Sequence, residues 1–166
     1  MVALFLILTF AIITGYVIHI ASKHKALKSI SDSEYWLSYP WKWVFEAVMF
    51  SCGLLLMHVG FNITKDPQWL IFAGGCGIFG VGLFARFKKN RFYQIAHYTC
   101  AVVGFVSLAL SFIWFGYWYW TIVVAVVTGL CYIFSKRDNP GILIWNVELF
   151  LIYSIFIGFG LVLSGL

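Results

Sequence analysis

The chain has 166 residues, of which 63% are apolar and only 10% are charged, and its formal net charge is +5. Soluble domains average about 45–50% apolar and about 25% charged residues. This composition excludes a soluble domain, because a chain of this length cannot bury so much apolar surface. The positive charge is explained by cations that lie near anionic lipid headgroups, so it does not indicate a nucleic-acid partner.

Six apolar runs are long enough to cross a bilayer, which takes about 20 residues, range roughly 17–25. Membrane barrels show short segments of alternating hydrophobicity instead, and these runs do not alternate. We therefore expect one all-α integral membrane domain over residues 1–166, built as a bundle of six transmembrane helices. The expected spans cover residues 2–22, 42–61, 68–86, 92–114, 118–135 and 142–164, each to within a few residues.

The distribution of cations predicts the orientation of the bundle. Ten of the eleven Lys and Arg residues lie in or beside the first, third and fifth loops, and only Lys65 lies in an even-numbered loop. The positive-inside rule places the cation-rich side in the cytoplasm. We expect a multi-pass protein of a bacterial inner membrane, with loops 1, 3 and 5 cytoplasmic and both termini outside.

The first span and the loop after it carry the first candidate residues. No basic residue precedes residues 2–22 and no small-residue cleavage pattern follows them, so we expect a first span and not a signal peptide. The loop over residues 23–41 contains Ser31 and Asp32. Such residues often cap helices, but they also suit a polar binding site, and the sequence leaves both interpretations open.

The second span carries Glu46 about one turn inside its cytoplasmic edge. A carboxylate at this depth can reach the interface, pair with Lys42, or contribute to a site. The third span contains Gly75, Gly77 and Gly80, which match the GxGxxG pattern of dinucleotide-binding loops. Because the match lies inside an apolar helix, we interpret the glycines of this span as a surface for close helix packing.

The cations Lys88, Lys89 and Arg91 lie in the third loop, just before the fourth span, which carries His97 one to two turns inside. A stripe of small and polar residues continues from His97 along the helix and should face protein, because hydrocarbon offers no hydrogen-bond partners. The fifth span carries no candidate site residue.

The sixth span carries Asn146 and Glu148 in its first turns. With the predicted topology, Glu148 lies at the same depth as His97 and Glu46, near the cytoplasmic edge. Ionisable residues inside spans are costly, so they pair with one another or mark a functional site. His97 and Glu148 are therefore either a structural pair that links two helices or part of a site that also includes Asp32.

Three of these features together resemble a known family. They are Ser29-Ile30-Ser31-Asp32 in the first loop, Gly82 followed by His97, and Glu148 early in the last span. The chain resembles the six-span family that contains the damage-regulated autophagy modulators and the GPI-anchor remodelling factors. It is also similar to small bacterial six-span proteins of unknown function. The resemblance covers most of the chain and implies a six-helix bundle linked to lipid handling or membrane organisation.

Two functions follow as hypotheses. The first, which we favour, is a non-enzymatic protein that binds or organises lipid or a membrane partner at the cytoplasmic leaflet. Its partners would be membrane lipids, a second copy of the chain or another membrane protein. The binding residues predicted for it are Ser31, Asp32, Lys88, Lys89, Arg91 and Asn146.

The second hypothesis is an inner-leaflet lipid hydrolase. Histidine and carboxylates can act as general acid and base or hold zinc, although the sequence requires no cofactor and we predict no metal site. A transporter is less favoured, because the polar residues lie near one face and not at the midplane. The candidate catalytic residues are His97, Glu148, Glu46 and Asp32.

Overall fold

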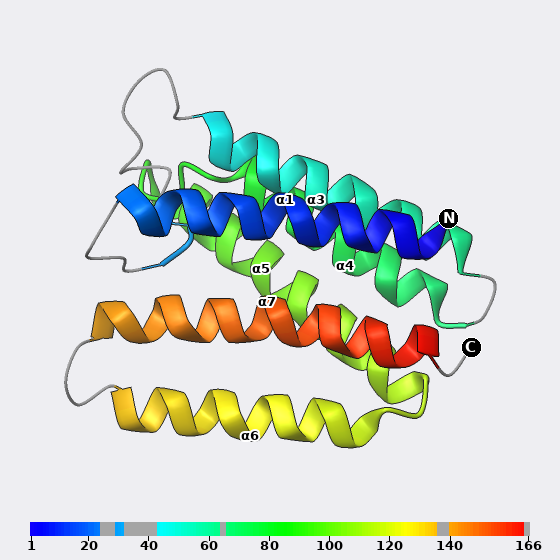
Figure 1. Ribbon diagram of the computed structural model, residues 1–166. Coiled ribbons are helices and arrows are strands. Elements are labelled where there is room, and N and C mark those ends of the chain that lie inside the picture. The colour runs from blue at the N-terminus through cyan, green and yellow to red at the C-terminus, as the bar shows by residue number, and fades with distance from the viewer. Residues whose placement is uncertain (24–28, 32–42, 64–65, 136–139, 165–166) are drawn as a thin grey trace.

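The computed structural model describes residues 1–23, 29–31, 43–63, 66–135 and 140–164 (Figure 1). All regular secondary structure in these ranges is α-helical, which confirms the all-α part of the prediction, with six helices among the described residues. The expected spans and the helices agree closely, and the largest difference is that α4 ends at Leu83 and not at residue 86. The helices are α1 (Val2–Lys23), α3 (Trp43–Asn62), α4 (Gln68–Leu83), α5 (Arg91–Trp114), α6 (Trp118–Ser135) and α7 (Pro140–Ser164).

Four of these helices are long and apolar enough to cross a membrane, namely α1, α3, α5 and the Trp145–Leu163 part of α7. Helix α4 is equally apolar but has 16 residues, which gives it a length of about 24 Å against a hydrocarbon thickness of about 30 Å. Large apolar side chains also lie exposed on the outside of the bundle, as a bilayer-embedded surface requires. Examples are Ile7, Ile18, Leu54, Val102 and Ile133.

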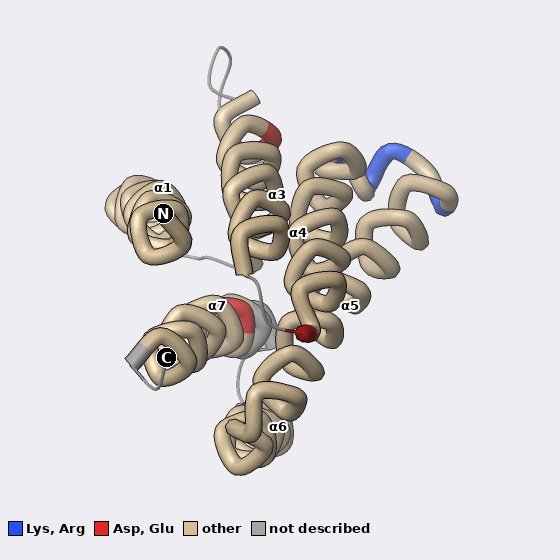
Figure 2. The backbone as a smooth tube through the Cα atoms, turned by 90° about the vertical axis from the view of Figure 1, so that its right-hand side faces the viewer, with Lys and Arg blue, Asp and Glu red and all other residues tan. Residues whose placement is uncertain are grey.

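Most of the helices run roughly along a common direction, whereas α5 crosses the bundle obliquely, and the start of α1 and the end of α7 lie at the same end of the bundle (Figure 1). Helix α4 packs closely against both α3 and α5, and α1 packs against α3. The α4–α5 connection lies at the opposite end, where Figure 2 shows Lys and Arg gathered. We call this the basic end, and its described cations are Lys23, Arg86, Lys88, Lys89 and Arg91.

Glycines allow the close packing around α4. A Cβ atom added to Gly75 would lie 2.6 Å from the backbone nitrogen of Met57 on α3. On the other side of α4, a Cβ on Gly77 would overlap the backbone of Gly104 on α5, and one on Gly74 would meet Leu108. The interpretation of these glycines as a packing surface is therefore confirmed.

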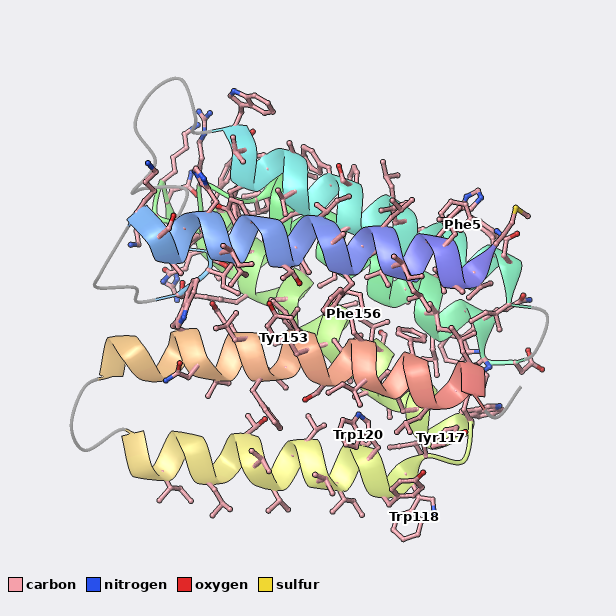
Figure 3. The ribbon with its side chains drawn as sticks, in the orientation of Figure 1. Phe5, Tyr117, Trp118, Trp120, Tyr153 and Phe156 are labelled. Atoms are coloured by element: carbon pink, nitrogen blue, oxygen red, sulfur yellow. The ribbon has the colours of Figure 1, made fainter. Side chains whose placement is uncertain are left out.

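Helices α6 and α7 form a hairpin that contacts the other helices more sparsely. Near the chain ends, Tyr117 Oη donates to the carbonyl oxygen of Leu161 at 2.8 Å, and Trp120 Nε1 donates to that of Ser154 at 3.0 Å (Figure 3). Against α1, the contact includes Phe10, whose ring lies 5.2 Å from that of Phe156. The two hydrogen bonds thus hold α6 and its preceding turn against α7, and the Phe10–Phe156 contact attaches the hairpin to α1.

We expect Gly77→Ala to destabilise the bundle, because overpacking a tight contact typically costs about 1–3 kcal/mol. The matched control is Gly129→Ala on α6, where an added Cβ has no neighbour within 4 Å. The measurement is the thermal unfolding midpoint in detergent. The midpoint should fall for Gly77→Ala and stay unchanged or rise for Gly129→Ala, and equal midpoints would contradict this account of α4 packing.

Candidate functional site

Residues 29–31, which lie between α1 and α3 in the sequence, enter the basic end of the bundle, where Ser29 and Ile30 are buried and Ser31 is half-buried. Ser29 is 8% exposed and Ile30 is 3% exposed. The Ile30 side chain belongs to a core cluster that includes Ile13 of α1, Phe45 of α3 and Trp145 of α7. A segment outside the helices thus becomes part of the core, so its backbone polar groups need partners inside the protein.

One partner is Glu148 on α7, whose carboxylate oxygen Oε2 accepts a hydrogen bond from the backbone N–H of Ile30. Hydrogen bonds to an ionised carboxylate are about twice as strong as those between neutral groups. This bond joins the segment to a helix 118 residues further along the chain. Glu148 therefore fixes the backbone that leads into Ser31.

A side-chain contact also holds the segment, and it comes from His97 on α5, which is 2% exposed. Its Nε2 atom lies 3.0 Å from Ser31 Oγ, and its Nδ1 atom lies 3.1 Å from the carbonyl oxygen of Phe84. Since a carbonyl oxygen can only accept, Nδ1 must carry the proton. In the neutral imidazole, Nε2 is then the acceptor and the Ser31 hydroxyl donates to it.

The local sequence explains how His97 reaches these partners. Helix α4 ends at Leu83, so the Phe84 carbonyl belongs to the helix end, where the helix itself provides no partner. Asn90 then starts α5 by accepting a hydrogen bond from the backbone N–H of Tyr93 at 2.9 Å. His97 follows two turns later, and its ring stacks on Phe87 with the ring centres 4.6 Å apart.

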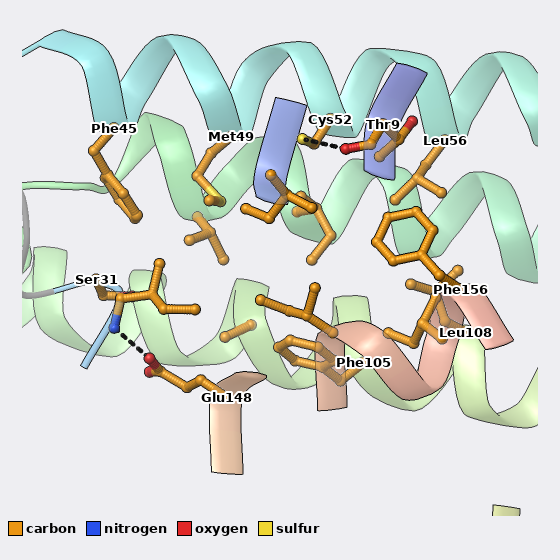
Figure 4. A pocket seen from close by; sticks show the side chains of 17 residues that line it. Thr9, Ser31, Phe45, Met49, Cys52, Leu56, Phe105, Leu108, Glu148 and Phe156 are labelled. Atoms are coloured by element: carbon orange, nitrogen blue, oxygen red, sulfur yellow. Dashed lines mark hydrogen bonds between the residues drawn. The ribbon is translucent and has the colours of Figure 1, made fainter. Parts of the chain in front are cut away.

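A cavity of about 100 Å³ begins at this polar cluster and extends between the helices (Figure 4). Ser31 and Glu148 lie at one end of it, and most of its other lining side chains are apolar. Thr9 and Cys52 are two of the other lining residues, and the Cys52 thiol donates to the backbone oxygen of Thr9, with 3.9 Å between sulfur and oxygen. The apolar lining comes from α1, α3, α4, α5 and α7 and includes Ile13, Met49, Leu56, Ile78, Val81, Ala101, Phe105, Ile152 and Phe156.

Not all predicted site residues lie at the cavity. Glu46 forms an ion pair with Arg86, with 3.5 Å between Arg86 Nε and Glu46 Oε1. The alternative partner considered for it, Lys42, lies outside the described residues, as does Asp32. Among the described candidates, Ser31 and Glu148 line the cavity, His97 binds Ser31 without being a lining residue, and Glu46 does not line it.

The remaining predicted binding residues are exposed at the basic end. Lys88 Nζ lies 5.6 Å from the ring centre of Phe87, and Lys89 Nζ lies 5.3 Å from that of Tyr93. Arg91 and Asn146 are exposed at the starts of α5 and α7. Within the described ranges, no three His, Cys, Asp or Glu residues are grouped so that they could hold a metal ion.

Sequence reasoning missed two parts of the site. The first is the backbone of Phe84 and Ile30, whose carbonyl and N–H groups bind His97 and Glu148. A helix that ends just before an aromatic residue was the only signal for the Phe84 carbonyl. Ile30 belonged to the Ser29–Asp32 loop motif, but nothing in that motif indicated that its backbone N–H binds Glu148. The second is the cavity, whose apolar lining is indistinguishable from ordinary span sequence.

No protein-family model, curated protein or solved structure matches this chain. The resemblance to the six-span family stays a prediction, and the role of the site rests on its geometry.

We expect His97→Ala to lower the free energy of unfolding by about 2 kcal/mol, because it leaves the Phe84 carbonyl and the Ser31 hydroxyl without this buried partner. The matched control is His19→Ala, since His19 is exposed on α1. Denaturant unfolding in mixed micelles measures both. Equal losses in the two variants would show that the buried hydrogen bonds of His97 contribute no stability.

Proposed function

We propose that the chain is a six-span membrane protein with both termini outside, which binds a lipid of the cytoplasmic leaflet. One acyl chain would occupy the cavity, and the polar part of the lipid would lie at Ser31, His97 and Glu148. The observation that carries this proposal is the cavity itself, because it combines apolar walls with a polar end formed by Ser31 and Glu148. The lipid handling implied by the family resemblance points the same way.

The size and lining of the cavity favour an apolar occupant over water. A cavity needs about 10–15 Å³ by this measure to hold one water molecule, so about 100 Å³ accommodates several methylene-sized groups in a row. Water in a cavity needs two to four polar partners, and apolar cavities stay dry and take apolar guests. Over most of its length the lining offers methyl, methylene and phenyl groups instead.

The polar end would decide which lipid binds. Transfer of an acyl chain from the bilayer into the cavity gains little hydrophobic free energy, because lipid tails are as apolar as the cavity walls. Affinity must then come from close packing and from polar contacts at Ser31 and Glu148. A ligand with hydrogen-bonding groups next to its acyl chain fits this arrangement.

The leaflet follows from the charges. Ser31 and Glu148 lie at the basic end, together with the exposed cations Lys88, Lys89 and Arg91. Each such cation contributes about 1 kcal/mol of attraction to an anionic membrane surface, and the positive-inside rule puts this side in the cytoplasm. Glu46, one of the candidate catalytic residues, pairs with Arg86 and does not line the cavity, so the binding proposal depends on Ser31 and Glu148.

We expect Ala101→Phe to reduce bound lipid about tenfold, because a phenyl group at this lining position fills the cavity. The matched control is Val102→Phe, which adds the same side chain at the next residue of α5, where the native side chain is 60% exposed. Native mass spectrometry of each purified protein gives the fraction with one lipid bound. If Ala101→Phe retained as much lipid as Val102→Phe, the proposed cavity site would be wrong.

A further inference from the structure

The arrangement of Ser31 and His97 carries an inference beyond binding, and it rests on the proposed lipid site. We propose that Ser31 is a nucleophile and His97 its general base, and that the pair accepts the acyl group of a long-chain ester held in the cavity. An activated serine requires a base within about 2.6–3.2 Å and a third group that orients the base. The 3.0 Å separation of Ser31 Oγ and His97 Nε2 meets the first requirement.

The Phe84 carbonyl meets the second requirement. It accepts from His97 Nδ1 at 3.1 Å and thereby keeps the proton on Nδ1 and the lone pair on Nε2. A carboxylate performs this orienting task in the Ser-His-Asp arrangement, and here a backbone carbonyl at the end of α4 performs it. The tautomer that results is the one in which His97 can take a proton from Ser31.

Both members of the pair are held in place. His97 is buried and stacked on Phe87, so its ring has little freedom to rotate. Ser31 follows Ile30, whose side chain is fixed in the core and whose N–H is held by Glu148. Glu148 is thus a positioning residue, because it acts on the backbone that carries the nucleophile.

The surroundings of Ser31 indicate the class of substrate. Next to Ser31 the cavity is lined by Ile30 and then by further apolar side chains. An acyl chain that lies along this lining brings its carbonyl carbon to Ser31. The Glu148 carboxylate at the same end opposes a second negative charge. A neutral ester therefore fits this end better than a free fatty acid, whose carboxylate would face that of Glu148.

The reaction needs no oxidant or reductant. Ser31 Oγ forms a bond to the carbonyl carbon of the ester while its proton passes to His97 Nε2. The bond between that carbon and the alcohol oxygen then breaks, and the alcohol leaves with the proton from Nε2. The acyl group remains on Ser31 until water or the hydroxyl group of a second lipid attacks the new ester, with His97 again carrying the proton.

A long-chain alkyl fluorophosphonate tests the pair, because it phosphonylates an activated serine oxygen and releases fluoride. The whole purified chain is treated in micelles, and the modified residue is located by peptide mass spectrometry. We expect one label per chain, at Ser31. Labelling should be lost in Ser31→Ala and fall about a hundredfold in His97→Gln, since general-base catalysis contributes about 10²–10⁴-fold, while Ser22→Ala, at an exposed position of α1, should label as the wild type does.

Glu148 provides a test of positioning. Glu148→Gln keeps an oxygen that accepts from Ile30 N–H, so its labelling rate should stay within about threefold of the wild type, whereas Glu148→Ala should label at least tenfold more slowly. Equal rates in the two variants would remove Glu148 from this role.

The wild-type protein alone decides the main proposal, whatever the stability of the variants. If it holds lipid but Ser31 remains unmodified at high probe concentration, the nucleophile is wrong and the binding function stands. If Ser31 is labelled but Ala101→Phe retains its lipid, the nucleophile stands outside a cavity site and its proposed acyl substrate is wrong. A label that His97→Gln does not slow would exclude His97 as the base.

Discussion

The hydrogen bonds that hold residues 30 and 31 between α5 and α7 are the constraint on which the polar end of the structure depends. His97 binds Ser31, and Glu148 binds the backbone of Ile30, so two helices with few direct contacts are joined through a third segment. Each of these groups is costly to bury without a partner. The segment, the histidine and the glutamate therefore have to be considered as one unit, and the cavity begins where that unit ends.

The cavity itself follows from an uneven distribution of small residues. In a bilayer no hydrophobic force draws helices together, so their separation depends on how closely their surfaces fit. Gly75 and Gly77 bring α4 against α3 and α5, whereas α7 presents Ile152 and Phe156 toward the others and stays further apart. Helix α5 is closely packed on one side and loosely packed on the other. The loosely packed side leaves a space lined by α7, and a lipid chain can fill that space.

The sequence was sufficient to predict the helices and the direction of the polar stripe on α5. Helix positions follow from hydropathy, because the backbone N–H and C=O groups of a bilayer-spanning segment must form their hydrogen bonds within a helix. His97 is buried and faces inward as predicted. The sequence also identified Ser31 and Glu148 as candidates, but not their relation. The path of a loop into a bundle depends on contacts across more than 60 residues, as between Ser31 and His97, and no local pattern encodes it. The partner of Glu46 was missed for the same reason, since Arg86 lies 40 positions further along the chain and Lys42 only four positions before it.

The central claim is that one lipid lies with its acyl chain in the cavity and its polar part at Ser31. A fatty-acyl ester with a diazirine midway along its chain tests this claim most directly. The ester is bound to the purified protein, the unbound ester is removed by detergent exchange, and the diazirine is then activated by light. The account predicts adducts on lining residues distant from Ser31, such as Leu56, Ile78 and Phe156. Adducts confined to the exposed side chains of α5 and α6, such as Val102 and Ile122, would place the lipid on the outer surface and contradict it.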